Sequence, residues 1–336
     1  MIPWPVSLTL IITFGMPRKQ RICPAPSTSA TFIREASMDS SRTLVSGVSG
    51  PIGAALLPSL NARGHKITRL VRGAPSDEEQ VAWDPAQPLP PKSVSGFEAV
   101  IHLAGETVVG RWTEAKKNRI LNSRVLGTRH LAEALAQAPQ RPRVLISASA
   151  IGYYGDRGDE ILHEASPSGN GFLPEVCRQW EAATQPATQA SIRTVQMRIG
   201  VVLSSVGGAL PKMLLPFRLG VGGNMGSGHQ WWSWIHVQDL VGAIHHILKS
   251  DLLQGPLNVV APKPVTNAEF TRVLASVLSR PAIFPMPVFA ARLVFGQMGE
   301  EVLLASQRVE PAKLIASGYP FHYVDLKKAL EEILKR

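Results

Sequence analysis

The sequence has only two cysteines in its 336 residues, Cys23 and Cys177. They lie far apart in the sequence and form neither a metal-ligand spacing nor a disulfide framework. So few cysteines are typical of a protein from a reducing compartment. The sequence therefore predicts a cytoplasmic protein without a metal site.

The sequence also lacks a run of about 20 apolar residues, the length that a membrane-spanning helix requires. Residues 2–14 are apolar, but basic residues follow them rather than precede them, so they do not match a secretory signal. Met38 stands just before the first strand-like run. We interpret residues 1–40 as a disordered or wrongly assigned extension and Met38 as the natural start. A short membrane anchor is the alternative, and we expect no membrane partner.

Acidic residues are fewer than basic ones, 25 Asp and Glu against 35 Lys and Arg, which gives a formal net charge of +10. The basic residues are scattered, with no aromatic-interleaved basic stripe and no zinc-finger spacing. We therefore expect a small-molecule substrate and no nucleic acid as partner. The apolar content of 45% is enough for the chain to bury a full core.

The most informative motif is a glycine-rich turn directly after the apolar, β-branched run at residues 43–47. Gly47 permits a sharp turn, Gly50 lets the backbone approach a pyrophosphate, and Gly53 lets the next helix pack closely on the sheet. Pro51 suits the first helical position, because its missing N–H would have no partner there. The motif predicts a dinucleotide site in which a helix N-terminus faces the phosphates.

A second strand-like run, residues 66–72, ends in Arg72, where NAD-selective sites usually carry Asp or Glu. The nearest acids, Asp77 and Glu78, follow only after a turn. A guanidinium suits the 2′-phosphate of NADP, which a carboxylate would repel. The sequence therefore favours NADP as the cofactor, with an ordinary surface arginine as the alternative.

Strand-like and helix-like segments alternate from residue 43 to about residue 205. We expect strands at residues 43–47, 66–72, 98–103, 143–149 and 193–202, and helices at 52–63, 112–137 and 172–189. This alternation predicts an α/β fold, a Rossmann-type doubly wound parallel sheet. We expect an NADP-binding domain at 41–205 and a smaller C-terminal substrate lobe at 206–336, with interleaving of their elements allowed.

Longer motifs narrow the prediction to a family. They are WDP at residues 83–85, VIHLAGE at 100–106, ISASAIGYYG at 146–155, RIGVVL at 198–203, LPFRLG at 215–220 and GSGHQWWSWIHVQDL at 226–240. With them the chain resembles the extended and atypical short-chain dehydrogenases/reductases, in the branch of NAD-dependent epimerases and dehydratases. The resemblance covers residues 42–334. The part from about residue 281 is similar to a short helical C-terminal module of unknown function.

The resemblance implies how the chain would hold its cofactor. The implied contacts are Gly47, Ser49, Gly50, Pro51, Ile52, Gly53, Arg72, Leu103, Ala104, Arg124 and Val202. Leu103 and Ala104 come where a strand ends, the edge at which parallel sheets bind ligands. Arg124 stands where these enzymes usually carry Asn, and Val202 would lie near the nicotinamide. Core packing of the apolar residues and a surface role for Arg124 are the alternatives.

The catalytic residues depart from the family pattern. Members use a Tyr-x-x-x-Lys pair, in which Lys lowers the pKa of Tyr for proton transfer while hydride moves to or from the nicotinamide. Here the matching helix has an apolar residue and Cys177 at the positions of Tyr and Lys. We do not expect Cys177 to be a nucleophile, because no partner His is evident. Ser149 matches the serine that binds the substrate oxygen. Tyr153 or Tyr154 would replace the missing proton carrier, with packing beneath the loop as the alternative.

Trp232 stands where sugar-nucleotide epimerases usually carry an Arg for the substrate pyrophosphate, which disfavours a nucleotide-sugar substrate. The leading hypothesis is an NADP(H)-dependent oxidoreductase or epimerase-like enzyme that acts on a small carbonyl or hydroxyl compound by hydride transfer. The first alternative is a non-catalytic NADP(H)-binding sensor. The second is a sugar-nucleotide epimerase in which Arg218 or another cation replaces the missing arginine.

Overall fold

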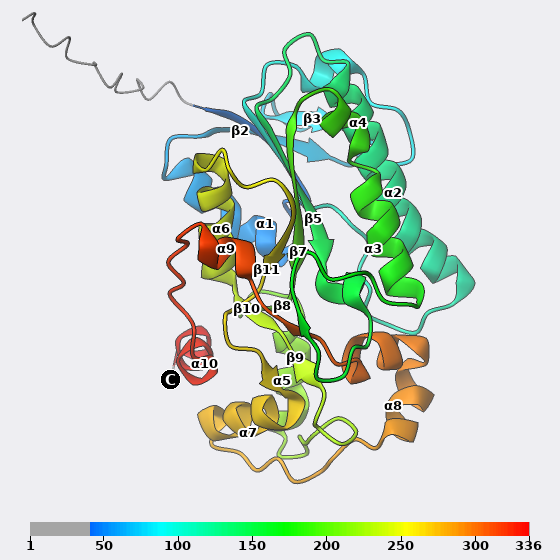
Figure 1. Cartoon of the computed structure of the whole chain (residues 1–336), viewed down its shortest axis with the longest axis vertical. Coiled ribbons are helices and arrows are strands. Elements are labelled where there is room, and N and C mark those ends of the chain that lie inside the picture. Colours follow the sequence, from blue (N-terminus) through cyan, green and yellow to red (C-terminus); the bar gives the residue numbers. More distant parts are fainter. Residues whose placement is uncertain (1–40, 336) are drawn as a thin grey trace, which may run out of the picture. The chain divides into compact units, whose positions relative to one another are not determined.

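A seven-stranded sheet with the strand order β11-β7-β5-β4-β1-β2-β3 forms the centre of the computed structural model, which describes residues 41–335 (Figure 1). All neighbouring strands in it are parallel. They are β1 (Arg42–Ser46), β2 (Lys66–Val71), β3 (Gln80–Ala82), β4 (Ala99–His102), β5 (Val144–Ala150), β7 (Arg193–Ile199) and β11 (Gly255–Val259). The chain order reverses between β1 and β4, the kind of switch point where open parallel sheets bind ligands.

Helices cover both faces of this sheet, which confirms the predicted doubly wound α/β fold. One face carries α1 (Pro51–Asn61) and α6 (Val237–Lys249); the other carries α2 (Glu114–Ala136), α3 (Phe172–Ala182) and α4 (Gln185–Gln189). Along β1, Leu44 packs into one core cluster and its neighbour Val45 into the other. Successive side chains of a strand point to opposite faces, so a sheet buried on both sides needs such continuous apolar runs.

Two predicted elements are each divided. The expected strand at 193–202 is two strands, β7 and β8 (Val201–Leu203), separated by Gly200. A Cβ at Gly200 would lie 2.6 Å from the backbone oxygen of Ser233, so the close approach of that chain breaks the strand. The expected helix at 172–189 is α3 followed by α4.

The remaining elements are shorter. The strands pair as β8 with β10 (Trp234–His236), β9 (Trp231–Trp232) with β12 (Val265–Thr266), and β6 (Ile161–Leu162) with β13 (Arg308–Val309). The helices are α5 (Leu210–Arg218), α7 (Asn267–Leu278), α8 (Val288–Phe295), α9 (Ala312–Ala316), α10 (Leu326–Leu334), and the single turns η1 (Pro91–Val94), η2 (Ile151–Tyr154) and η3 (Gly299–Leu304). Because α6 and β11 belong to the central layers, elements from beyond residue 205 interleave with those before it.

The interpretation of residues 1–40 lies outside the described residues. Among residues 41–335, no helix is both long and apolar enough to cross a bilayer.

A buried histidine joins the end of β4 to the helices behind it. His102 is fully buried; its Nδ1 lies 2.7 Å from the Ser46 hydroxyl and its Nε2 3.0 Å from the Thr128 hydroxyl. Trp180 also donates to the Thr128 hydroxyl, at 2.9 Å. Burial lowers the pKa of His102 to about 4. This network therefore contains a neutral imidazole near pH 7.

We expect acid to destabilise the fold through His102 and the buried His245, whose pKa burial also lowers to about 4. Unfolded histidine binds a proton near pH 6.5, so the unfolded state binds more protons between the two pKa values and stability falls as the pH falls through that window. Going from about pH 7 to pH 5 should cost about 2 kcal/mol per histidine. Urea unfolding at both pH values measures this cost. His102→Gln should reduce the pH dependence, whereas His229→Gln, at an exposed position, should leave it unchanged; an equal slope for both variants contradicts the assignment.

Candidate functional site

The glycine-rich turn packs directly on the end of β4. Gly47 has φ +73°, and a Cβ there would lie 2.5 Å from the carbonyl carbon of Leu103 and 2.7 Å from the amide nitrogen of Ala104. A Cβ at Gly53 would lie 2.6 Å from the Cα of Val48. No side chain fits in either place without backbone movement, so both glycines are required by close approach. The structure thus brings the turn together with Leu103 and Ala104.

The N-terminus of α1 faces out of this turn. Gly50 is the N-cap, Pro51 is the first helical residue, and the first helical hydrogen bond runs from the Ala54 amide to the Gly50 oxygen at 2.9 Å. The amides of Ile52 and Gly53 therefore have no carbonyl partner within the helix. The first turn also contains no acidic side chain, so nothing in it offsets the positive end of the helix dipole. The exposed Ser49 precedes the cap.

The loop after β8 approaches the same helix end. Ideal Cβ positions at Gly207 and Gly208 lie 3.7 Å and 3.8 Å from atoms of the Pro51 ring, and the second lies 4.0 Å from the oxygen of Val202. Val202 itself is half-buried and packs against the core. The predicted contact Val202, one residue before the end of β8, therefore lies near the loop that approaches the glycine turn.

Cations surround the loop that follows β4. Lys116 donates to Glu106 at 2.5 Å. This bond, and the positive charges of Arg119 and Arg72, hold the pKa of the Glu106 carboxyl below its usual range. Arg72 is exposed directly after β2 and makes no hydrogen bond within the described residues. Its guanidinium is free to meet an anion beside the switch point.

Arg124 faces inward from α2. Its guanidinium carbon lies 3.2 Å from the ideal Cβ position of Gly105 and 5.0 Å from the ring centroid of Trp180. Within residues 41–335 the guanidinium makes one hydrogen bond, from Nη1 to the Ile120 oxygen at 3.2 Å. Burial lowers the pKa of Arg124, while the nearby Cys177 and Glu106 act in the opposite direction. The cation therefore lies between the end of β4 and α3, not on an open helix surface.

The helix α3 carries Leu173 and Cys177, which stand at the positions expected for the family's Tyr and Lys. A Cβ on Gly152, in η2, would lie 3.4 Å from the Cβ of Leu173 and 3.9 Å from the Sγ of Cys177. These two residues are one helical turn apart and face the same loop. Cys177 is 2% exposed, and burial raises the pKa of its thiol to about 12. A thiol that stays protonated is not a nucleophile.

The Ser149 hydroxyl is hydrogen-bonded to a buried ion pair, Glu181 with Arg198. The hydroxyl, on a residue 3% exposed, donates to Glu181 Oε1 at 2.7 Å. The Arg198 guanidinium also donates to both carboxylate oxygens of Glu181, each bond 2.8 Å long. Contact of Ser149 with a substrate oxygen would therefore require the hydroxyl to leave Glu181.

The two tyrosines have different surroundings. Tyr154 is fully buried; its hydroxyl lies 2.7 Å from Asn258 Oδ1 and accepts a hydrogen bond from Arg198 at 3.0 Å. Burial raises the pKa of Tyr154, the opposite of what a proton carrier near neutrality requires. Tyr153 is half-buried, with its ring 3.5 Å from the Arg198 guanidinium carbon and no hydrogen bond to its hydroxyl within residues 41–335. Tyr154 thus packs beneath the loop, while Tyr153 keeps a free hydroxyl.

A cavity of about 420 Å³ adjoins η2 and the start of α3. From the sheet side it is lined by Gly152, Gly155, Asp156, Asn170, Leu173 and Pro174, and from the C-terminal side by Val288, Arg292, Glu300, Glu301 and Leu304, among others. The only cation among the lining residues is Arg292, which pairs with Glu300 at 2.7 Å. The lining favours a neutral or cationic group over a diphosphate.

Glu301 was not predicted from the sequence, although it supports the site. Its carboxylate accepts hydrogen bonds from the Phe172 amide at 3.1 Å and the Leu173 amide at 2.8 Å, so it caps α3. The only signal in the sequence is that α3 follows Gly171, which has no side chain to cap it. The C-terminal segment thereby holds the helix that carries Leu173 and Cys177.

The tryptophan-rich strand does not line the cavity. Trp232 is 7% exposed and packs against Phe270 with ring centroids 5.3 Å apart. Arg218 is exposed on α5 and does not line the cavity either. Neither residue therefore offers a ligand for a substrate pyrophosphate there. Among residues 41–335, no group of three or more metal-ligating side chains is arranged around a common point.

Comparison with known proteins agrees with this geometry. The profile of the NAD dependent epimerase/dehydratase family matches residues 43–259, and a domain of unknown function, DUF1731, matches residues 286–333. The chain is 40% identical to the human epimerase family protein SDR39U1 over 297 residues, 87% of this chain and 99% of that one. It is also 40% identical to an epimerase family protein of Mycobacterium tuberculosis over 288 residues, 85% of this chain and 95% of that one.

Solved structures show the same relationship. The structure of human SDR39U1 (isoform 2) with NADPH has a TM-score of 0.81 and 39% identity, and the match covers 88% of this chain and 99% of that one. A nucleoside-diphosphate sugar epimerase from Corynebacterium glutamicum has a TM-score of 0.74 and 40% identity, and the match covers 88% of this chain but 58% of that one. The chain therefore belongs to the NAD-dependent epimerase/dehydratase family, and its C-terminus carries the DUF1731 domain.

Proposed function

We propose that the chain binds NADP(H) and acts as an epimerase-like oxidoreductase on a small carbonyl or hydroxyl compound. The observation that carries the proposal is the glycine turn, where an ideal Cβ at Gly50 meets only the Gly47 oxygen, at 3.4 Å, and the free amides of α1 offer partners to a pyrophosphate. Family membership and the NADPH bound to human SDR39U1 support the choice of cofactor. When bound, the nicotinamide would supply the hydride chemistry.

The described residues then take separate roles. The pyrophosphate would lie on the turn formed by residues 47–53, with Leu103 and Ala104 along the dinucleotide and Val202 toward the nicotinamide. Arg72 would bind the 2′-phosphate. The half-buried Arg124 lies beside Cys177, the position at which the family carries its lysine, so we assign it the cofactor-facing positive charge that the lysine would supply.

Proton transfer would fall to Tyr153. It keeps a free hydroxyl at η2, and its ring lies against the Arg198 guanidinium, whose carbon is 3.5 Å from the ring centroid. Ser149 would bind the substrate oxygen only after release from Glu181, and Tyr154 stays a structural residue because its hydroxyl is held in the core.

The test follows nicotinamide absorbance while the protein is incubated with NADPH and a panel of ketones, aldehydes, quinones and a nucleotide sugar. We expect NADPH oxidation with a carbonyl compound, and we expect Tyr153→Phe to reduce it strongly at unchanged NADPH affinity. Cys177→Ser serves as the matched control and should keep the activity. If neither coenzyme binds the folded, ligand-free protein, the proposal fails.

A second candidate is a non-catalytic NADP(H) sensor. The specific observation in its favour is that Ser149 and Tyr154 are both held in one buried network and the lysine is missing. Tight NADPH binding without consumption across the whole panel, with no effect of Tyr153→Phe, would favour the sensor. Turnover of the nucleotide sugar alone would favour a sugar-nucleotide epimerase, the class named for the Corynebacterium glutamicum structure.

Arg72 should determine the choice between the two coenzymes. Because a charge-assisted phosphate contact contributes about 1.5–3 kcal/mol, Arg72→Ala should weaken NADPH binding by about 10- to 100-fold and NADH binding far less. Calorimetry with both coenzymes measures this difference. Arg63→Ala, at an exposed position after α1, is the matched control. Equal losses for NADPH and NADH would defeat the assignment of Arg72.

A further inference from the structure

Exposed apolar side chains are concentrated around α5 and α8. Six large ones, each between 56% and 73% exposed, define what we call the α5–α8 face: Leu215, Leu219, Ile283, Phe284, Phe289 and Leu293. Ala291 is the only buried residue of the apolar helix α8. Such a concentration exceeds the scattered apolar residues of an ordinary protein surface and indicates an interaction site.

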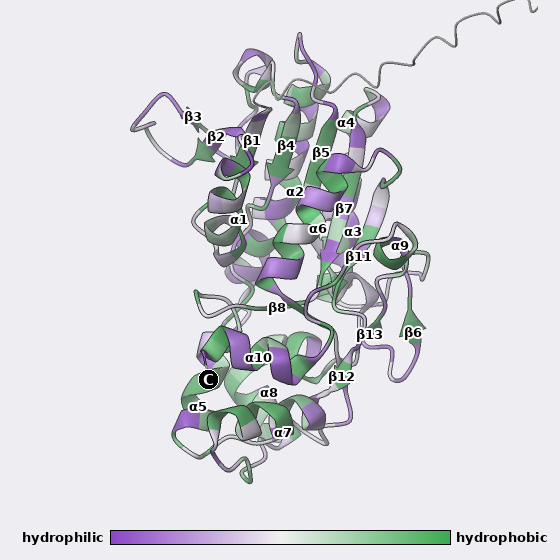
Figure 2. Ribbon diagram, turned by 90° about the vertical axis from the view of Figure 1, so that its left-hand side faces the viewer, coloured by the Kyte–Doolittle hydropathy of each residue, from purple (hydrophilic) through white to green (hydrophobic). Residues whose placement is uncertain are grey.

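The members of this face are continuous in space. Segment 281–286 runs beside the chain that leaves α5, with hydrogen bonds from Phe284 to Gly222 at 3.1 Å and from Met286 to Asn224 at 2.8 Å. The helix α8 begins two residues later. Figure 2 shows the hydrophobic colouring of α5, α7 and α8 gathered at the lower end of the picture. The six side chains therefore belong to one region.

The exposed charge of this region is mainly positive, although Arg292 is paired with Glu300 at 2.7 Å. Residues 205–238 and 270–299 contain no Asp or Glu, although the whole chain has 25. The same two segments contain the exposed cations Lys212, Arg218, Arg272, Arg280 and Arg292. Two copies of the chain that met through this face would bring like charges together, which disfavours a homodimer.

Against the sequence-based expectation of no membrane partner, we propose that the α5–α8 face docks on the surface of an anionic lipid bilayer. Exposed aliphatic and aromatic side chains together with an excess of basic residues are typical of segments that lie in a membrane interface. The apolar side chains enter the boundary between headgroups and acyl chains, and the cations pair with anionic headgroups. Since Val288 and Arg292 of α8 line the 420 Å³ cavity, docking brings that cavity to the bilayer surface.

The test is co-sedimentation of the full chain with vesicles of phosphatidylglycerol and phosphatidylcholine in equal parts, and with phosphatidylcholine alone. We expect binding to the anionic vesicles, weakened by added salt, and little binding to the neutral ones. Two test variants remove the two parts of the interaction. Phe289→Ser with Leu293→Ser, and Lys212→Glu with Arg218→Glu, should each weaken binding by at least about tenfold.

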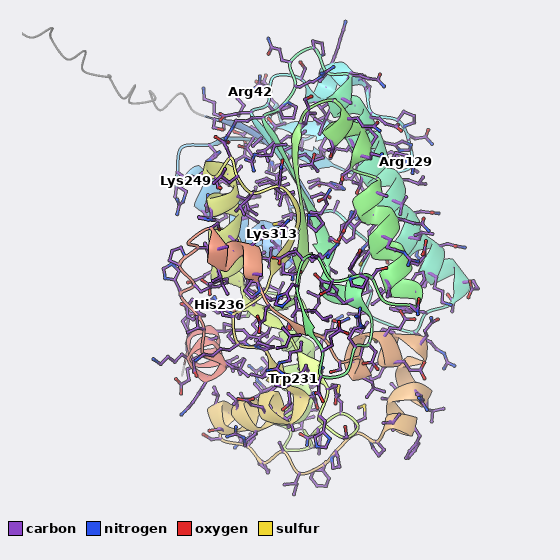
Figure 3. The ribbon with its side chains drawn as sticks, viewed as in Figure 1. Arg42, Arg129, Trp231, His236, Lys249 and Lys313 are labelled. Carbon is purple, nitrogen blue, oxygen red and sulfur yellow. The ribbon has the colours of Figure 1, made fainter. Side chains whose placement is uncertain are left out.

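Matched controls carry the same kinds of change elsewhere. Leu252→Ser alters a side chain 91% exposed between α6 and β11. Arg129→Glu with Lys249→Glu reverses two exposed cations on α2 and α6, at the opposite end of the molecule from α8 (Figure 3). Both controls should bind as the unchanged chain does, and the N-terminal 40 residues are present in every arm.

Three results would overturn the proposal. The first is that the unchanged chain ignores anionic vesicles. The second is that the controls lose as much binding as the test variants. The third is a concentration-dependent dimer in sedimentation that Phe289→Ser with Leu293→Ser abolishes, which would assign the face to a second copy. None of these substitutions alters a residue of the proposed cofactor site, so NADPH affinity serves as the check on folding.

Discussion

Gly47→Ala is expected to abolish NADP(H) binding and to destabilise the fold. The added Cβ would lie 2.5 Å from the Leu103 carbonyl carbon, which is backbone and cannot turn aside as a side chain can. The residue would also have to keep φ +73°, a conformation that costs a non-glycine residue about 1 kcal/mol. We expect loss of binding by at least about 100-fold and a total loss of stability of about 3 kcal/mol, since the turn must move away from the end of β4.

Gly64 provides a matched control for the backbone cost alone. It has φ +79°, yet an ideal Cβ there meets nothing within 4 Å. Gly64→Ala should therefore cost about 1 kcal/mol in urea unfolding and leave NADPH affinity unchanged. Similar losses of stability and affinity in both variants would show that the contact between the turn and β4 is not what excludes a side chain at residue 47.

Glu181→Gln should destabilise the protein more than any other single change of charge that we consider. Glu181 and Arg198 form an ion pair with side-chain exposures of 11% and 3%. Burial lowers the pKa of Arg198, but its hydrogen bond to Glu181 and the charge of Glu181 raise it by more, so the guanidinium stays charged. Glutamine keeps the size and removes the charge, which leaves a buried cation unpaired at a cost of about 3–5 kcal/mol.

Glu175→Gln is the control for this change, because it lies on the same helix and pairs with Arg178 at the surface. Exposed pairs contribute little, so we expect a loss below about 0.5 kcal/mol in the same urea titration. A double variant, Glu181→Leu with Arg198→Leu, should be more stable than Glu181→Gln, since no charge is left unpaired. If Glu181→Gln and Glu175→Gln lower the free energy of unfolding equally, the pair of Glu181 with Arg198 does not stabilise the buried part of the site.

The parts of the fold that depend on neighbouring residues could be predicted from the sequence. Short apolar runs divided by glycines predicted β1, β2, β4 and β5, because strand formation and turn chemistry are local. The glycine turn was likewise predicted, and the structure adds the reason for Gly47 and Gly53. The break at Gly200 was not predicted, because its cause is the backbone oxygen of Ser233. That residue lies between β9 and β10, far from Gly200 in the sequence.

The candidate site shows the same limit. Motif position placed Tyr153 and Tyr154 on the loop that follows Ser149, but it did not predict that Glu181, 32 positions after Ser149, accepts a hydrogen bond from the Ser149 hydroxyl. Arg198 was visible within a motif, yet its partners come from α3 and η2. Partners that are distant in the sequence meet only when helices and strands pack together. The residue type at one position therefore does not show which partner it will have. The roles of Tyr153 and Arg72 are predictions that Tyr153→Phe and Arg72→Ala test, and the roles of Ser149 and Arg124 are predictions as well.

The cap that Glu301 provides for α3 has a consequence for engineering the chain. A protein cut before residue 286 would leave the first two amides of α3 without an acceptor, so that helix would begin to unwind where it meets η2. The two matched regions are then not exchangeable cassettes: a graft from a relative succeeds only if it brings a carboxylate to the same point. The terminal segment is for this reason a working part of the nucleotide-binding half of the molecule and cannot be trimmed away as an appendage.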